Sequence, residues 1–324
     1  MAELAQAART GDLLTLERLL AHRTDADYSD GAVATALFVA ACNNHIPIVE
    51  RLLTVHGVDV NCLGPNGSPV LYWVAHGGHL PVMECLLTHK ADVDRANNIG
   101  RAPLCAAASN GQLPAVECLV AHGANINRTD NNGATVLHVA ASSGRLPVVE
   151  YLLTHGVDVN HATIMHGETA LYLAVHGKHL PVAECLLAHG ADPNHVTNDG
   201  GTALYTAVYD GSLPMVECLL KHKVDVDYVN DYDETALWWA TCHHHLPIVN
   251  RLLEYQFGSG RWICDVEVFE TFLQQFQQQV RTVACCWSAN LGDSYNPLNE
   301  LPVELLHLLL ISMWEEHQPP AQSE

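Results

Sequence analysis

The sequence predicts an all-α solenoid, in which short pairs of helices stack in a row. A Leu-Pro-x-x-Glu phrase, or a near variant, recurs along the 324-residue chain at intervals of 33 or 34 residues. Each proline opens a run with apolar residues at three-and-four spacing, which indicates an amphipathic helix. Units this thin expose apolar surface on both flanks, so neighbours must stack into one continuous core. The recurring prolines are Pro47, Pro81, Pro114, Pro147, Pro181, Pro214 and Pro247.

A second short helix is predicted about twelve residues before each proline. Its clearest copy is Gly133–Ala141, which reads Gly-Ala-Thr-Val-Leu-His-Val-Ala-Ala. Thr135 is placed to cap the start of this helix, because a threonine side chain can accept a hydrogen bond from a free N–H of the first turn. The same role is expected of Thr35, Thr169, Thr202 and Thr235.

The repeat resembles the ankyrin repeat, whose signature Gly-x-Thr-Pro-Leu-His-x-Ala-Ala is followed by Gly-His-x-x-Val-Val-x-Leu-Leu-x-x-Gly-Ala-x-Val-Asn. The best local copies are residues 133–141, 146–153 and 122–127. The resemblance implies an ankyrin-repeat solenoid with short hairpin fingers. It covers seven repeats in residues 31–256, preceded by a capping half-repeat in residues 1–30.

The chain departs from the signature at the turn between the two helices. The glycine expected there is replaced by Asn44, Lys178 and His244. If the turn needs a positive φ, asparagine fits easily, whereas the lysine and the histidine carry strain.

Residues 257–317 follow the array and allow two interpretations. After Gly258-Ser259-Gly260, apolar residues from Val266 to Val283 recur at spacings of three and four, which predicts a long amphipathic helix. Residues 286–300 are expected to form a loop, and residues 301–310 a short helix that resembles the opening of F-box motifs, as in ubiquitin-ligase substrate receptors. The region is therefore either a C-terminal cap or a recruitment box. The tail 318–324 is expected to be disordered.

Composition limits the class of partner. Fifteen Lys and Arg against 36 Asp and Glu give a formal net charge of −21, which argues against a nucleic-acid partner. No apolar stretch is long enough to span a membrane. The first residues lack a basic region followed by an apolar one, so no secretory signal is expected and the expected location is the cytoplasm or the nucleus. The eleven cysteines then indicate free thiols.

The sequence predicts neither an enzyme nor a metal or cofactor site. Most of the 21 histidines fall into two repeat columns, one after each second helix and one before it. A zinc site needs three or four converging ligands, and the histidine pairs supply at most half of one. Phosphate loops, nucleophile elbows and His-Glu-x-x-His motifs are absent. An enzyme or a metal-binding protein is the most distant alternative.

The resemblance implies that partners contact the hairpin tips and the ends of the first helices. These positions differ from copy to copy, whereas the scaffold columns stay constant. The predicted contact residues at the tips are Asn98, Ile99, Arg101, Asn131, Asn132, Met165, His166, Glu168, Asn198, Asp199, Asp231, Tyr232 and Glu234. Those at the helix ends are His176, Tyr209, Asp210 and His243.

Two features favour the C-terminal half of this surface. The hairpin between Asn160 and Gly167 is one residue longer than its counterparts and should project or bulge. Tyrosines at 209, 228 and 232 neighbour several aspartates, and such acids would steer a basic partner. The sequence therefore predicts a non-catalytic scaffold that binds a protein or peptide, and the acidic residues favour a basic one. The alternative is a substrate receptor whose C-terminal helices recruit a cullin-type ubiquitin-ligase adaptor.

Overall fold

The computed structural model describes residues 2–21, 30–230, 234–243 and 245–257. Within these ranges the chain forms sixteen α-helices, one 3₁₀ turn at Pro65–Gly67 (η1) and no strand. The first helices of the pairs are α1 (Ala2–Thr10), α3 (Asp30–Cys42), α5 (Val70–Gly77), α7 (Pro103–Ser109), α9 (Val136–Ser142), α11 (Ala170–His176), α13 (Ala203–Tyr209) and α15 (Ala236–Cys242). The second helices are α2 (Leu13–Ala21), α4 (Ile46–Thr54), α6 (Leu80–Thr88), α8 (Leu113–Ala121), α10 (Leu146–Thr154), α12 (Leu180–Ala188), α14 (Leu213–Lys221) and α16 (Leu246–Phe257).

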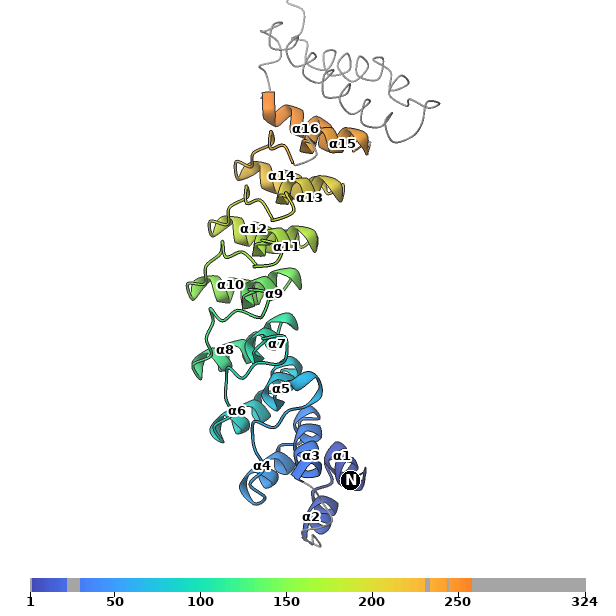
Figure 1. Cartoon of the computed structure of the whole chain (residues 1–324), viewed down its shortest axis with the longest axis vertical. Helices are drawn as coiled ribbons and strands as arrows, with labels where there is room; N and C mark the ends of the chain where they lie inside the picture. Colours follow the sequence, from blue (N-terminus) through green and yellow to red (C-terminus); the bar gives the residue numbers. More distant parts are fainter. Residues whose placement is uncertain (1, 22–29, 231–233, 244, 258–324) are drawn as a thin grey trace, which may run out of the picture. The chain divides into compact units, whose positions relative to one another are not determined.

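The helix pairs stack in chain order. Each first helix packs on the first helix of the next pair, from α1 to α15, and the second helices do the same from α2 to α14 (Figure 1). The predicted all-α solenoid is confirmed. The predictions for residues 258–324 lie outside the described residues.

The core runs along the stack because the same columns are apolar in each repeat. Leu137 of α9 and Leu152 of α10 are fully buried, as are the alanines Ala140 and Ala141. Burying a leucine stabilises a fold by roughly 1.5–3 kcal/mol, while the small alanines let neighbouring first helices approach closely. Each repeat therefore gains much of its interior from its neighbours.

The turn between the two helices does require the left-handed backbone region. Asn44 has φ 61° and Lys178 has φ 60°, close to the φ of 69° at Gly144 in the same column. At Lys178 the two turn hydrogen bonds run from its N–H to Val175 O and from His179 N–H to Ala174 O, each 2.9 Å, as in a Schellman motif. The condition of a positive φ is therefore met at Asn44 and at Lys178, and His244 lies outside the described part.

Helix capping follows the predictions at three threonines. The hydroxyl oxygens of Thr169, Thr202 and Thr235 accept hydrogen bonds from the N–H three residues ahead, at 3.2, 3.2 and 3.1 Å. The prediction for Thr35 is wrong. Helix α3 begins at Asp30, so Thr35 lies inside it and donates its hydroxyl to Gly31 O at 2.7 Å.

Candidate binding face

The tips of successive hairpins are joined to one another by backbone hydrogen bonds. We call this series of bonded tips the fingertip ladder. It runs from η1 to the hairpin before α13. Because each tip holds the next, the tips are fixed relative to one another along the stack. The bonds are Asn98 N to Asn66 O (3.4 Å), Asn131 N to Ile99 O (3.1 Å), Ile164 N to Asn132 O (2.8 Å) and Asn198 N to His166 O (2.8 Å).

Three of the asparagines predicted to contact a partner reinforce this ladder. Asn131 Nδ2 donates to Asn98 O at 3.1 Å, and Asn198 Nδ2 donates to Met165 O at 3.2 Å. Asn132 Oδ1 accepts from Met165 N at 3.2 Å. The structure therefore gives these side chains a scaffold role that their variable positions did not indicate.

The base of each finger is set by a residue that the sequence analysis did not single out. Asp130 Oδ1 accepts from Asn132 N at 2.9 Å and Ala134 N at 3.0 Å, and Asn97 Oδ1 accepts from Ile99 N and Arg101 N at 3.1 and 3.0 Å. Thr163, Thr197 and Asn230 occupy the same place. These short polar residues recur every 33 or 34 positions, and that recurrence in the sequence could have identified them as a structural position of the repeat.

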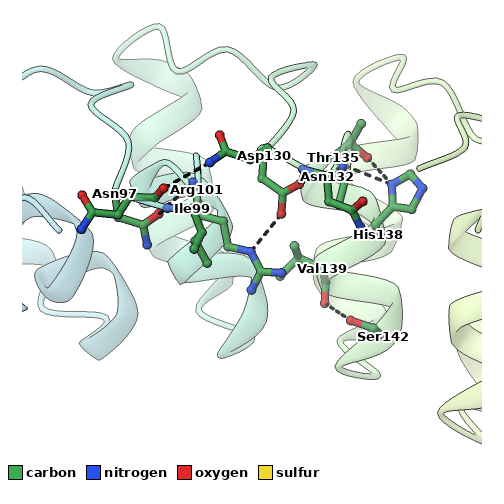
Figure 2. Close-up of polar contacts among 12 residues, drawn as sticks. Asn97, Ile99, Arg101, Asp130, Asn132, Thr135, His138, Val139 and Ser142 are labelled. Atoms are coloured by element: carbon green, nitrogen blue, oxygen red, sulfur yellow. Dashed lines mark hydrogen bonds and ion pairs between the residues drawn. The ribbon is translucent and has the colours of Figure 1, made fainter. Parts of the chain in front are cut away.

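Figure 2 shows how two neighbouring fingers are tied together by charge. Arg101 Nε lies 3.2 Å from Asp130 Oδ2, and the Asp130 side chain is only 6% exposed. Arg101, predicted as a contact residue, is thus engaged within the protein. On the adjacent α9, the close-up places Val139 and Ser142 along one helix, where the Ser142 hydroxyl donates to Val139 O at 3.1 Å.

Apolar side chains project from the ladder at two tips. Ile99 is 53% exposed, Ile164 76% and Met165 69%. The last two belong to the longer hairpin, where the bridge Ala162–Thr169 spans 169 − 162 = 7 positions against 135 − 129 = 6 for Thr129–Thr135. The longer hairpin therefore presents an isoleucine and a methionine to solvent, which agrees with the projection expected from its length.

Aromatic rings gather along α13 and α15 and reach their C-terminal ends at Tyr209 and His243. Tyr209 is 58% exposed, and its ring stacks on that of Trp239 with centroids 5.4 Å apart and planes at 25°. His243 stacks on the same indole at 4.3 Å and 24°, and Tyr205 contacts it at 5.4 Å. A weaker counterpart lies on α11, where Tyr172 and His176 stack at 6.5 Å.

The predicted group of tyrosines and aspartates is divided. Asp210 Oδ1 pairs with Lys178 Nζ at 3.2 Å beside Tyr209, whereas Tyr228 donates its hydroxyl to Gly200 O at 3.2 Å. Asp225 belongs to the loop after α14, where its N–H donates to Asn194 Oδ1 at 2.7 Å. Residues that the sequence analysis grouped therefore lie in two places. Tyr209 and Asp210 lie at the end of α13, whereas Asp225 and Tyr228 lie in the loop after α14 and make other contacts. Asp231 and Tyr232 lie outside the described residues.

Two carboxylates remain near the face. Glu234 Oε2 accepts from Tyr205 OH at 3.4 Å and from Asn230 Nδ2 at 3.0 Å, which places its charge at the edge of the rings. At the longer finger, His166 Nδ1 lies 3.8 Å from Asp199 Oδ2. Glu168 N donates to Thr163 Oγ1 at 3.0 Å, within the same hairpin.

The histidine columns serve the backbone. His89, His122, His155 and His189 each lie with Nδ1 2.8–2.9 Å from the carbonyl oxygen four residues back, at the end of a second helix. His45, His79 and His179 lie with Nε2 2.9–3.1 Å from a carbonyl oxygen at the end of the first helix of the preceding repeat, namely Arg9 O, Cys42 O and Ser142 O. These contacts satisfy helix-end acceptors that lack an intrahelical partner.

The described residues hold no group of three or more His, Cys, Asp or Glu side chains placed to bind a metal. Their cysteines are free, and burial raises the pKa of the Cys105 thiol to about 11. No described helix has the length and apolarity that a bilayer crossing requires.

Comparison with known families agrees with this architecture. A family model described as "Ankyrin repeats (3 copies)" matches residues 4–97, 37–130, 71–163, 104–197 and 171–260, which together cover most of the chain. The chain belongs to the ankyrin repeat family. Ankyrin repeats mediate protein–protein binding, so a general role in protein interaction follows from membership.

Three relatives illustrate how far this likeness extends. An ankyrin repeat protein of Rickettsia bellii is 32% identical over 57 residues, which are 18% of this chain and 32% of that protein. Palmitoyltransferase AKR1 of Lachancea kluyveri is 30% identical over 101 residues, 30% of this chain and 14% of the relative. Palmitoyltransferase akr1 of Schizosaccharomyces pombe is 34% identical over 59 residues, which are 18% of this chain and 9% of the relative. The chain thus spans a third or less of each, and the transferase activity in two names belongs to those proteins.

Proposed function

We propose that this ankyrin repeat protein is a non-catalytic scaffold that binds a basic peptide segment of a partner protein across the fingertip ladder and the ends of the first helices. The observation that carries the proposal is the exposure of Ile164 and Met165 on a backbone held by hydrogen bonds on both sides. Because the backbone beneath these side chains is already fixed, binding does not have to order the loop, so they suit a contact surface. The net charge of −21 favours a partner of opposite sign.

The test begins with random peptides displayed on phage and selected against the full chain. We expect enriched peptides to be net basic, and we expect their association with the protein to slow as salt rises, because screening weakens long-range attraction. Enrichment of acidic peptides, an association rate that ignores salt, or no enrichment at all would contradict the proposal.

Paired variants locate the contact. Replacing Ile164 and Met165 together by serine should weaken binding of an enriched peptide by about tenfold or more, the usual loss when an apolar anchor is removed. Leu14→Ser is the matched control, because Leu14 is 81% exposed on α2, away from the ladder. Equal losses in both variants would place the contact elsewhere.

A second candidate is a ubiquitin-ligase substrate receptor. It is favoured by the Leu301-Pro302-x-Glu304-Leu-Leu phrase, which resembles the opening of an F-box. Affinity purification of the full chain and of a version ending at Gly258 separates the two candidates. Cullin adaptors that copurify only with the full chain support the receptor, and their absence from both leaves the scaffold.

A further inference from the structure

The aromatic rings at the ends of α13 and α15 offer more than apolar contact area. We define the ring cluster as Tyr205, Tyr209, Trp239 and His243. The Trp239 indole is its centre, with the other three rings at 4.3–5.4 Å from it. His243 is held in place because its Nδ1 lies 3.1 Å from Trp239 O, one helical turn back.

The cluster leaves one large ring open to solvent. Tyr209 stacks on Trp239 with planes at 25°, yet more than half of its surface (58%) remains exposed. The stacking occupies one face of the tyrosine ring, and a ring face that stays open attracts a cation that lies within about 6 Å of the ring centre. An exposed tyrosine packed on a tryptophan is thus a surface for a positive group as well as for an apolar one.

A carboxylate borders the cluster on one side and an ion pair on the other. Glu234 Oε2 accepts a hydrogen bond from Tyr205 OH, so a carboxylate lies at the edge of the rings. Asp210 directly follows Tyr209, and its charge is shared with Lys178 at 3.2 Å. A partner cation at the cluster would therefore find ring faces beneath it and the Glu234 carboxylate at the edge formed by Tyr205.

We propose that the ring cluster is the subsite for an arginine side chain of the bound peptide. The inference rests on the proposed function, because it assigns one chemical group of the basic peptide to one place on the binding face. Arginine is favoured over lysine because its planar guanidinium stacks on a ring and is more weakly hydrated than an ammonium group, so it loses less solvation when it leaves water.

The test uses a peptide enriched from the phage library and the full protein. One arginine at a time is replaced by citrulline, which keeps the shape of the side chain and removes its charge. At the arginine that meets the cluster, we expect the dissociation constant to rise about 2- to 30-fold, the range of a cation–π contact. This arm changes only the peptide, so the fold of the protein is untouched.

Two substitutions of the exposed tyrosine separate a cation contact from an apolar one. Tyr209→Phe keeps the ring and should bind within about twofold of the wild type, whereas Tyr209→Leu keeps only apolar bulk and should lose as much as the citrulline peptide does. Against Tyr209→Leu, the citrulline substitution should cost almost nothing more, because the two changes remove the same interaction.

The outcomes distinguish failure of the arginine subsite from failure of the proposed scaffold function. If Tyr209→Leu binds the peptide as well as Tyr209→Phe does, or if the citrulline penalty persists in Tyr209→Leu, the arginine subsite is wrong and the scaffold proposal stands. Enriched peptides without arginine lead to the same conclusion. If no peptide is enriched, both proposals fall.

Discussion

His138 shows how a single residue of the repeat signature joins two repeats. Its Nδ1 accepts from the Thr135 N–H at 3.2 Å and from the Thr135 hydroxyl at 2.8 Å, so the ring proton is on Nε2, which donates to Glu168 O at 3.1 Å in the next repeat. The residue is 1% exposed, and this burial lowers the pKa of His138 to about 4. The folded chain therefore holds the ring neutral.

The buried ring predicts a loss of stability in mild acid. The unfolded chain takes up a proton on His138 below about pH 6.5, whereas the folded chain takes it up only near pH 4. The stabilisation from the neutral ring is therefore complete above about pH 6.5 and is lost as the pH falls toward 4. From about pH 7.5 to about pH 5, this one residue should lower the free energy of unfolding by on the order of 2 kcal/mol. Urea denaturation at both pH values measures it.

The control is a comparison of variants at the same two pH values. His138→Gln should show a shallower dependence on pH than the wild type, although it will be less stable. His155→Gln, which changes an exposed ring, should keep the wild-type dependence. Equal slopes in all three proteins would contradict the assignment.

Left-handed lysines make a second prediction at this scale. Lys90 has φ 65° at the end of α6, and Gly123 occupies the same turn one repeat later with φ 86°. Lys90→Gly should raise the free energy of unfolding by about 0.5–1 kcal/mol. A side chain costs about 1–2 kcal/mol in the left-handed backbone region, and the greater freedom of glycine in the unfolded chain offsets part of the gain from removing it.

The reciprocal change tests the same strain. Gly123→Lys should destabilise by a similar amount, since nothing lies within 4 Å of the new Cβ and only the backbone opposes it. Thermal unfolding of both variants gives the two signs. A stabilised Gly123→Lys would show that φ does not limit these turns.

At the scale of the helix, capping depends on where the helix begins. Thr202 precedes α13 and accepts from Tyr205 N, whereas Thr35 lies within α3. Thr202→Ala should therefore lower the free energy of unfolding by about 1 kcal/mol, the usual loss of a cap. Thr35→Ala should change it little, because alanine is the better helix former. Chemical denaturation of the pair decides, and equal effects would count against the difference in role.

The fingers show what element geometry adds to a pattern. The extra residue between Asn160 and Gly167 could be counted from sequence, and it predicted a projection. That the projection presents Ile164 and Met165 depends on the bond from Ile164 N to Asn132 O in the neighbouring finger. Such a bond follows from how far one repeat is offset from the next, which a pattern within one repeat does not encode.

At the scale of the molecule, stability should be shared between neighbours and should fade with distance. Leu137 is fully buried in α9, which packs on α7 and α11. Leu137→Ala should cost about 2–5 kcal/mol, and amide hydrogen exchange should quicken in these three helices. Because each repeat contacts only its neighbours, α3 should be affected much less. Uniform acceleration from α1 to α15 would indicate a single cooperative unit instead.

The sequence by itself determined the fold, because a period of 33 or 34 residues with apolar columns leaves stacking as the way to bury each unit's flanks. It also located the fingers and the helix ends, since those positions vary between copies. Only the tertiary structure decided which of these side chains are engaged and which are free. Asn131 turns toward the preceding finger, whereas Asn132 and Arg101 turn toward the next one. Thr35 lies within a longer helix, and Tyr209 is joined by Trp239 from the next repeat. The physical reason is that the contacts of Asn131, Asn132, Arg101 and Tyr209 join residues about 30 positions apart, whose meeting depends on the offset and rotation between stacked units.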